Sequence, residues 1–177
     1  VYTMMTSVHQ QNLKSKTTKP IDLSYRLPEA NVAELIGLLE QMAELKQKGP
    51  VDLPEIADEA RLDIDDLFPI LEALSILGLA KVQEGDISMT SAGKELIDAD
   101  ITDKKILFSN VLKEKIPLAS YILETLSKKD HHRISEERIL RELEEYFTIE
   151  EAERILTTLI DWARYAELFS YDFNSKL

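Results

Sequence analysis

Cysteine is absent from this chain of 177 residues. Its absence excludes a disulfide framework, a thiol nucleophile and a thiolate metal site. Glycine is scarce as well: the five glycines are scattered, and none belongs to a GxxxxGK[ST] or GxGxxG pattern. Such patterns supply the backbone N–H groups that cradle nucleotide phosphates. We therefore expect that this chain does not bind ATP in the manner of a P-loop.

Long apolar runs are also missing. No stretch approaches the roughly 20 residues that a membrane-crossing helix needs, and no secretory signal peptide is visible. Basic residues are outnumbered, because 33 aspartates and glutamates stand against 21 lysines and arginines, for a net charge of −12. This surplus disfavours nucleic acid and anionic membranes as main partners. Acidic surfaces also serve solubility alone, and that reading covers much of the charge.

Residue types that perform catalysis do not gather in a recognisable pattern. The nearest approach to a metal site is Asp130-His131-His132, a polar turn in which adjacent histidines point in different directions. No nucleophile stands beside a base. We therefore predict no catalytic residue, no cofactor and no metal site, and we expect that this chain is not an enzyme by itself.

Apolar residues make up 44% of the chain, which is enough to build a core. Their spacing predicts helices, and Asn31 with Glu34 and Thr148 mark two helix starts. On the helix over 101–115 we place Ile101 and Ile106 on the apolar side. Outside the central stretch described next, the predicted helices cover residues 31–47, 91–99, 101–115, 118–127, 135–146 and 149–165.

The stretch from Leu53 to Asp86 organises the chain. It predicts a short helix over residues 53–60, a tight turn, a second helix over 64–77, and two strands over 79–82 and 87–90. Helix, turn, helix and hairpin in this order are typical of a winged helix-turn-helix. In DNA-binding proteins of that kind, the second helix enters the major groove by its N-terminal end.

The N-terminal end of that second helix is acidic. It carries Asp63, Asp65 and Asp66, which phosphates would repel. The expected fold and its usual function therefore disagree, and we interpret the three aspartates as candidates for protein interaction. Carboxylates in a first helical turn are also ordinary, because they favour the positive end of the helix dipole.

The second half of the chain repeats the first. The sequence LDIDDLFPILEAL from Leu62 parallels FTIEEAERILTTL from Phe147, and the following strand aligns only after a slip of four residues. Four residues are about one helical turn, so the slip preserves the buried face. Chance similarity between amphipathic helices is the alternative. The second copy also opens its helix with acids, and Glu150, Glu151 and Glu153 complete the set of candidate interaction residues.

The repeat predicts a second, degenerate winged helix that ends in a strand at Leu168, Phe169 and Tyr171. Within its last helix we expect Trp162 and Tyr165 to pack in the core, and Asp161 and Arg164 to face water. The predicted fold class is mainly α, with two tandem winged-helix-like modules that carry short β-hairpin wings. The organisation is residues 1–25 as the end of a preceding domain and a linker, 26–100 as module 1, and 101–177 as a connecting helix and module 2.

Three segments carry a resemblance to a known family: RLPEANVAELIGLLE, the stretch LDIDDLFPILEALSILGLAKVQEGDISMTSAGKELIDADI, and ERILRELEEYFTIEEAERILTTLIDWARYAELFSYD. Over about residues 26–172 the chain resembles the AAA-associated C-terminal domain. That domain follows the ATPase domain in some ABC-transporter subunits of the nitrate, sulfonate, taurine and bicarbonate group. VYTMMT at the N-terminus looks like the closing helix of such an ATPase domain, and residues 7–24 are the connector.

The resemblance implies an accessory, regulatory or protein-interaction domain of an ATPase subunit for anion uptake. Its partners would be the ATPase domain of the same subunit and, as a further candidate, a second copy of the chain. It would lie in the cytoplasm, at the inner face of the membrane, without inserting into it. Two alternatives stay open: a DNA-binding transcription regulator, and a sensor that holds a small molecule between the two modules.

Overall fold

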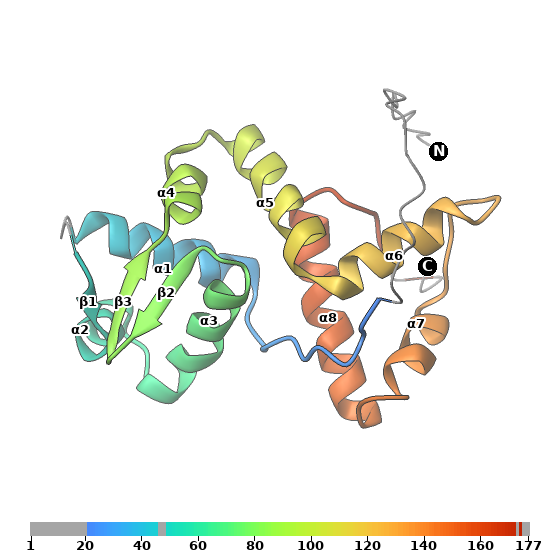
Figure 1. The fold of residues 1–177 in the computed structure, drawn as a ribbon, viewed down its shortest axis with the longest axis horizontal. Coiled ribbons are helices and arrows are strands. Elements are labelled where there is room, and N and C mark those ends of the chain that lie inside the picture. The colour runs from blue at the N-terminus through green and yellow to red at the C-terminus, as the bar shows by residue number, and fades with distance from the viewer. Residues whose placement is uncertain (1–20, 46–48, 173, 175–177) are drawn as a thin grey trace.

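The computed structural model describes residues 21–45, 49–172 and 174. This part of the chain is mainly helical, with eight α-helices and one small antiparallel sheet, so the mainly α class is confirmed. In Figure 1, α1 to α4 and the sheet lie on one side, α6 to α8 lie on the other, and α5 runs between them. The elements are α1 (Val32–Glu44), β1 (Val51–Asp52), α2 (Leu53–Ala60), α3 (Ile64–Ile76), β2 (Ala80–Gln83), β3 (Asp86–Met89), α4 (Ser91–Asp98), α5 (Ile101–Lys115), α6 (Pro117–Ser127), α7 (Glu136–Leu143) and α8 (Ile149–Tyr165).

Two helices begin with a capping box, which the sequence predicts at Asn31 and Glu34; at Thr148 it predicts the cap alone. At α1, the backbone N–H of Glu34 donates to the side chain of Asn31, and the Glu34 carboxylate accepts from the Asn31 backbone. Thr148 and Glu151 form the same reciprocal pair at α8. Each box satisfies N–H groups that the first helical turn leaves unpaired, so these starts are fixed by local chemistry.

The sheet has the strand order β1-β3-β2, and β3 is antiparallel to both neighbours. Ile87 of β3 pairs with Val51 on one side and with Val82 on the other, and its side chain is fully buried. The predicted hairpin is therefore present. The short strand β1, which directly precedes α2, was not predicted.

On α5, the expected apolar side is wrong for two residues. Ile101 is 79% exposed and Ile106 is 54% exposed, whereas Phe108 and Leu112 are fully buried. Successive residues turn by about 100° on a helix, so Ile106 lies about 200° from Phe108 and faces away from the core. Ile101 stands in the first turn, at the end of the helix. Both isoleucines are thus part of the surface.

The second module differs from the first in its strands. Within residues 101–172 and 174, no strand forms, so the predicted strand at Leu168, Phe169 and Tyr171 is wrong; the return strand of the predicted second wing lies outside the described residues. The sequence pattern there suits an extended segment, but residues 168–172 belong to neither a helix nor a strand. A strand requires a neighbouring strand with which its backbone forms a ladder, and the described sheet contains only β1, β3 and β2.

The helices α3 and α8 nevertheless correspond closely. They begin at Ile64 and Ile149, which the repeat aligns, and they contain 13 and 17 residues, so α8 is longer by the predicted turn. Each is followed, two residues after its end, by a left-handed residue: Gly78 with φ 69° and Glu167 with φ 54°. The next backbone N–H then returns to a carbonyl five residues earlier, at 2.9 Å in both cases. This is the C-cap expected where a helix meets an extended segment.

Three further boundaries differ from the predictions. Ser135 precedes α7 as expected, but its side chain makes no capping bond and the helix ends at Leu143. Leu23 is only 6% exposed, so the packed part of the chain begins within the predicted linker. The predicted closing helix in residues 1–6 and most of that linker lie outside the described residues.

Within the described ranges, no helix is both long and apolar enough to cross a bilayer.

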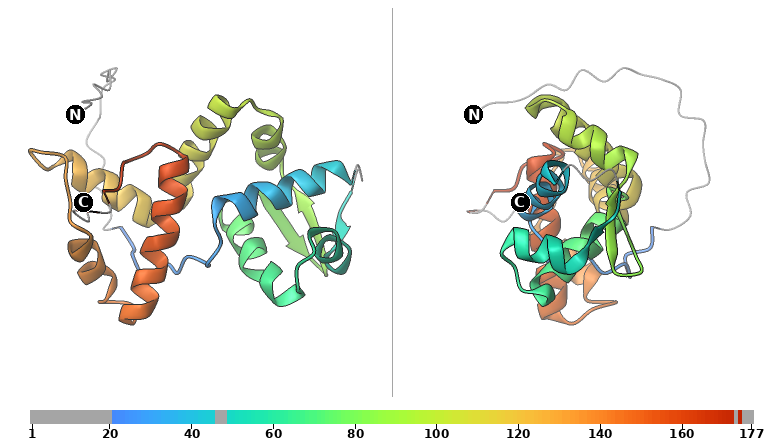
Figure 2. Two further views of the ribbon diagram at one scale, coloured as in Figure 1. Left: turned by 180° about the vertical axis from the view of Figure 1, so that it is seen from behind. Right: turned by 90° about the vertical axis from the view of Figure 1, so that its left-hand side faces the viewer.

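The two modules are joined where α8 meets the start of α1. The indole Nε1–H of Trp162 donates to the carbonyl of Ala30 at 2.8 Å, and Trp162 is fully buried as predicted. Asp161 is exposed, as expected, and its carboxylate also accepts from the backbone N–H of Val32 at 2.8 Å. Figures 1 and 2 both show the segment before α1 passing alongside α8. One turn of α8 therefore holds the first turn of α1.

We expect Trp162→Phe to lower the free energy of unfolding by about 1–3 kcal/mol. The substitution removes the donor to a buried carbonyl and leaves space where the indole was. Urea denaturation of both proteins checks this. Tyr146→Phe is the matched control, because Tyr146 is 52% exposed and loses only a polar atom. A loss below about 0.5 kcal/mol for Trp162→Phe would show that the junction contributes little.

We expect Glu167→Gly to raise the free energy of unfolding by about 0.5–1 kcal/mol, because glycine adopts the left-handed conformation at φ 54° without a Cβ clash. The substitution also removes an exposed ion pair with Lys105, which is worth about 0–1 kcal/mol. Lys105→Ala removes that ion pair alone and serves as the reference. Thermal unfolding of the three proteins gives the comparison. If Glu167→Gly lowered the free energy of unfolding more than Lys105→Ala does, the left-handed backbone of Glu167 would not be the source of strain.

Candidate functional site

A groove of about 1250 Å³ runs between the two modules. One wall is the start of α1 with the residues before it, another is the N-terminal half of α3, and the third is α8. The Trp162 and Asp161 contacts set this geometry, because they hold the start of α1 against α8. The groove is therefore a product of the joined modules and does not exist in either module alone.

Carboxylates dominate the residues that line the groove. Arg154 of α8 is the single basic side chain among its lining residues, and it forms no ion pair within 4 Å in the part of the chain that the structure describes. Negative charges that share a groove reinforce one another's potential. The lining carboxylates are Glu29, Glu34, Asp66, Glu150, Glu153 and Asp161.

The structure brings half of the predicted interaction residues together. Asp66 of α3 and Glu150 and Glu153 of α8 line the groove, so acids from both copies of the repeat meet in one place. The sequence suggested two separate faces. Joining the modules through α1 turns them into one, and this juxtaposition could not be read from the sequence.

The other three predicted residues lie outside the groove. Asp63 is the N-cap residue of α3 but makes no side-chain capping bond, and Asp65 is exposed in the first turn. Glu151 completes the capping box of α8 and lies 3.8 Å from the guanidinium of Arg26. These positions fit the ordinary preference of carboxylates for a helix N-terminus.

Sequence reasoning missed three groove residues: Glu29, Glu34 and Asp161. Two of them have local tasks that the sequence does signal, since Glu34 caps α1 and Asp161 belongs to the polar side of α8. Their shared location depends on contacts across 129 residues of sequence, such as the bond between Asp161 and Val32. No periodicity or motif reports a contact of that range.

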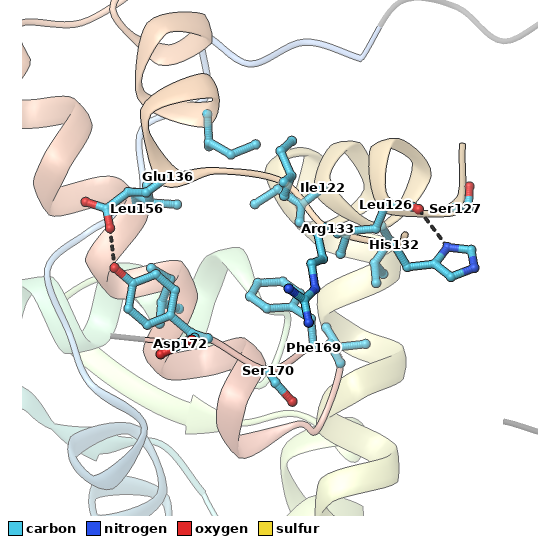
Figure 3. A pocket seen from close by; sticks show the side chains of 16 residues that line it. Ile122, Leu126, Ser127, His132, Arg133, Glu136, Leu156, Phe169, Ser170 and Asp172 are labelled. Carbon is cyan, nitrogen blue, oxygen red and sulfur yellow. Dashed lines mark hydrogen bonds between the residues drawn. The ribbon is translucent and has the colours of Figure 1, made fainter. Parts of the chain in front are cut away.

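A second cavity, of about 570 Å³, lies inside the second module. Its walls come from α6, the loop before α7, α7, α8 and the segment after α8. Figure 3 shows Glu136 and His132 at opposite ends of it, with Arg133 between them. The ring Nδ1 of His132 lies 2.9 Å from the carbonyl of Leu126. The sensor hypothesis placed a ligand between the modules, whereas this cavity lies within one of them.

The Glu136 end of that cavity contains a strong polar pair. The Tyr171 hydroxyl donates to the Glu136 carboxylate. This hydrogen bond first of all, then burial and the charges of Glu136 and Asp172, raise the pKa of Tyr171 to about 12. The neutral phenol is thus favoured in the folded state. The contact fastens the segment after α8 to the first turn of α7.

The raised pKa gives a titration test. The stabilising contribution of Tyr171 is complete below pH 10, the ordinary tyrosine value, and is lost as pH rises through about 12. We expect absorbance titration at 295 nm to show a last tyrosine step near pH 12 that Tyr171→Phe removes. Glu136→Gln should move that step toward pH 10, because the anionic acceptor is gone. A step near pH 12 that persists in Tyr171→Phe would contradict the assignment.

Comparison with known proteins gives one family. A family model described as the C-terminal AAA-associated domain matches residues 54–172. The match extends from α2 through α8 and so includes most of both modules, Asp66, Glu150 and Glu153 among them. Among curated proteins and among solved structures, no match to the chain was found.

Proposed function

Because the chain belongs to the C-terminal AAA-associated domain family, whose members accompany an ATPase domain, we propose that it is the accessory, regulatory domain of an ABC-transporter ATPase subunit. The subunit would serve anion uptake of the nitrate or sulfonate type, at the cytoplasmic face of the membrane. ATP hydrolysis would belong to the ATPase domain, and the chain itself would act by binding protein rather than by catalysis.

The groove between the modules is the observation that carries this proposal. Six carboxylates and one arginine line it, so a partner surface with lysines and arginines would relieve their mutual repulsion. The phosphates of a nucleic-acid duplex bind to positively charged side chains, whereas this groove is negatively charged. The groove therefore supports a cationic protein surface as the partner.

Apolar side chains stand beside the acids. Ile64 and Ile149 occupy the first positions of α3 and α8, and they are 43% and 58% exposed. Stable protein interfaces combine an apolar centre with a polar rim. Isoleucines next to exposed carboxylates supply these two components at both helix starts, although neither isoleucine lines the groove itself.

The proposed mode of regulation follows from the groove having walls in both modules. A partner that binds there contacts α3 and α8 at once, so its binding free energy depends on how the modules are placed. Binding to the ATPase domain would thereby be coupled to the arrangement of the accessory domain. By linkage, a change in that arrangement would alter the affinity for the partner.

The test uses the full subunit that carries the ATPase domain. We expect the triple variant Asp66→Asn, Glu150→Gln, Glu153→Gln to lose control of ATP hydrolysis, and the affinity between the separated ATPase domain and this chain to fall by about tenfold or more. Hydrolysis rates and titration calorimetry measure the two effects. Thermal unfolding checks that the variant is folded.

The matched control removes three carboxylates elsewhere: Asp130→Asn, Glu137→Gln, Glu144→Gln. All three are exposed, and none lines the groove. The net charge changes equally in both variants, so a general charge effect would appear in both. Equal behaviour of the two variants, or unchanged hydrolysis and affinity in the groove variant, would overturn the role of the groove.

A further inference from the structure

The cavity of about 570 Å³ in the second module has mainly apolar walls. Ile122, Ile139 and Leu156 are core residues that line it, and each is less than 5% exposed. Leu168 and Phe169, in the segment after α8, line another side and pack against the same core. Sites for small molecules have volumes of about 300–1,000 Å³ and walls of this kind. The cavity therefore has the size and the surface of a site for an apolar small molecule.

Three charged side chains line the same cavity, and two of them already accept hydrogen bonds. Glu136 accepts one from the Tyr171 hydroxyl, and Asp172 accepts one from the backbone N–H of Asn174 at 2.9 Å. Arg133 is exposed, and its guanidinium forms no hydrogen bond or ion pair with the rest of the chain that the structure describes. A guanidinium carries five N–H donors. Arg133 is thus the charged lining group that keeps its full capacity to bind an anion.

The charges are distributed unevenly around the cavity. Figure 3 shows Glu136 and Asp172 on one side and His132 on the other, with Arg133 between them. A ligand carboxylate is repelled on the Glu136 side and attracted by Arg133, because the planar guanidinium fork matches the two oxygens of a carboxylate. A ligand cation would approach Arg133 as a like charge. Attraction on one side and repulsion on the other therefore favour an anionic end group, held in one orientation.

We propose that this cavity binds a small apolar monocarboxylate. The carboxylate of the ligand pairs with the guanidinium of Arg133, and its hydrocarbon part lies against Ile122, Ile139 and Leu156. Burial of the hydrocarbon supplies most of the affinity. The ion pair stays close to water, where such a pair contributes little free energy, so it adds selectivity for the end group more than strength.

The proposed site is independent of the acidic groove. Both are bordered by α8, but Leu156 and Ile160 line the cavity, whereas Glu153, Thr157 and Asp161 line the groove. Among the described residues, none lines both. The ligand lies within the second module, so its binding does not depend on the function proposed for the groove between the modules.

The probes are octanoate, octan-1-ol and octylammonium, which share one straight hydrocarbon chain and differ in the charge of the end group. Each is titrated into the ¹⁵N-labelled full chain at millimolar concentration. Octanoate should shift the amide resonances of Arg133, Ile139 and Ile160 in a saturable way, and bind about threefold to tenfold more tightly than octan-1-ol. Octylammonium should bind more weakly than either. Acetate, which has the charge without the chain, should cause no saturable shift at these residues.

A pair of charge variants tests the role of the guanidinium. Arg133→Gln should remove the preference for octanoate over octan-1-ol and leave the affinity for octan-1-ol unchanged. Arg138→Gln is the matched control, because Arg138 is also an exposed arginine but does not line the cavity. It changes the net charge equally and should keep the preference.

A third variant tests the location. Ile160→Trp fills the cavity and should weaken the binding of octanoate and octan-1-ol at least tenfold. If Ile160→Trp fails to fold, the comparison of Arg133→Gln with Arg138→Gln still decides, because both arginines are exposed.

Four outcomes would overturn the proposal. Absence of a saturable shift with octanoate would mean that the cavity does not accept an apolar carboxylate. Equal or tighter binding of octan-1-ol or octylammonium would mean that the cavity does not select an anionic end group. A preference for octanoate that persists in Arg133→Gln would assign the carboxylate to another side chain. Saturable binding of acetate as tight as that of octanoate would show a surface anion site to which the apolar walls contribute nothing.

Discussion

The contact between α8 and the start of α1 is the constraint on which the rest of the structure depends. Trp162 reaches the carbonyl of Ala30, and Asp161 of the same turn holds the N–H of Val32. Phe108 of α5 adds an edge-to-face contact with Tyr165, one turn further along α8, with ring centroids 5.5 Å apart. Without these bonds, the acids of α3 and α8 would be unrelated surface charges. With them, the acids form one groove.

The two halves of the chain show what a repeat can keep and what it can lose. Both copies keep the helix that begins at Ile64 or Ile149, its acidic start and its left-handed C-cap. The second copy adds one turn to the helix and has no middle strand within the described residues.

Helix starts could be predicted from the sequence because their causes are local. The caps at Asn31 and Thr148 and the start of α3 depend on residues within one turn, and the structure has them as predicted. The strand predicted at Leu168, Phe169 and Tyr171 was wrong, because strand formation depends on a partner segment that the local sequence pattern does not report. Tertiary context likewise decided the exposure of Ile106 on α5.

The candidate site likewise contains some residues that the sequence indicates and others that only the folded structure brings together. Acids at the starts of α3 and α8 stand out in the sequence, and Asp66, Glu150 and Glu153 do line the groove. Glu29, Glu34 and Asp161 join them only through contacts between segments far apart in the chain. The family could be recognised from the sequence, since the family model matches residues 54–172. The geometry that makes a site of these acids could not.

Zero-length crosslinking of the intact subunit with a carbodiimide joins carboxylates to lysines in contact, and mass spectrometry identifies the joined residues. If the groove binds the ATPase domain, Asp66, Glu150 or Glu153 will be crosslinked to lysines of that domain. Crosslinks to that domain from acids outside the groove, such as Glu137 and Glu144, with none from the groove acids, would contradict it.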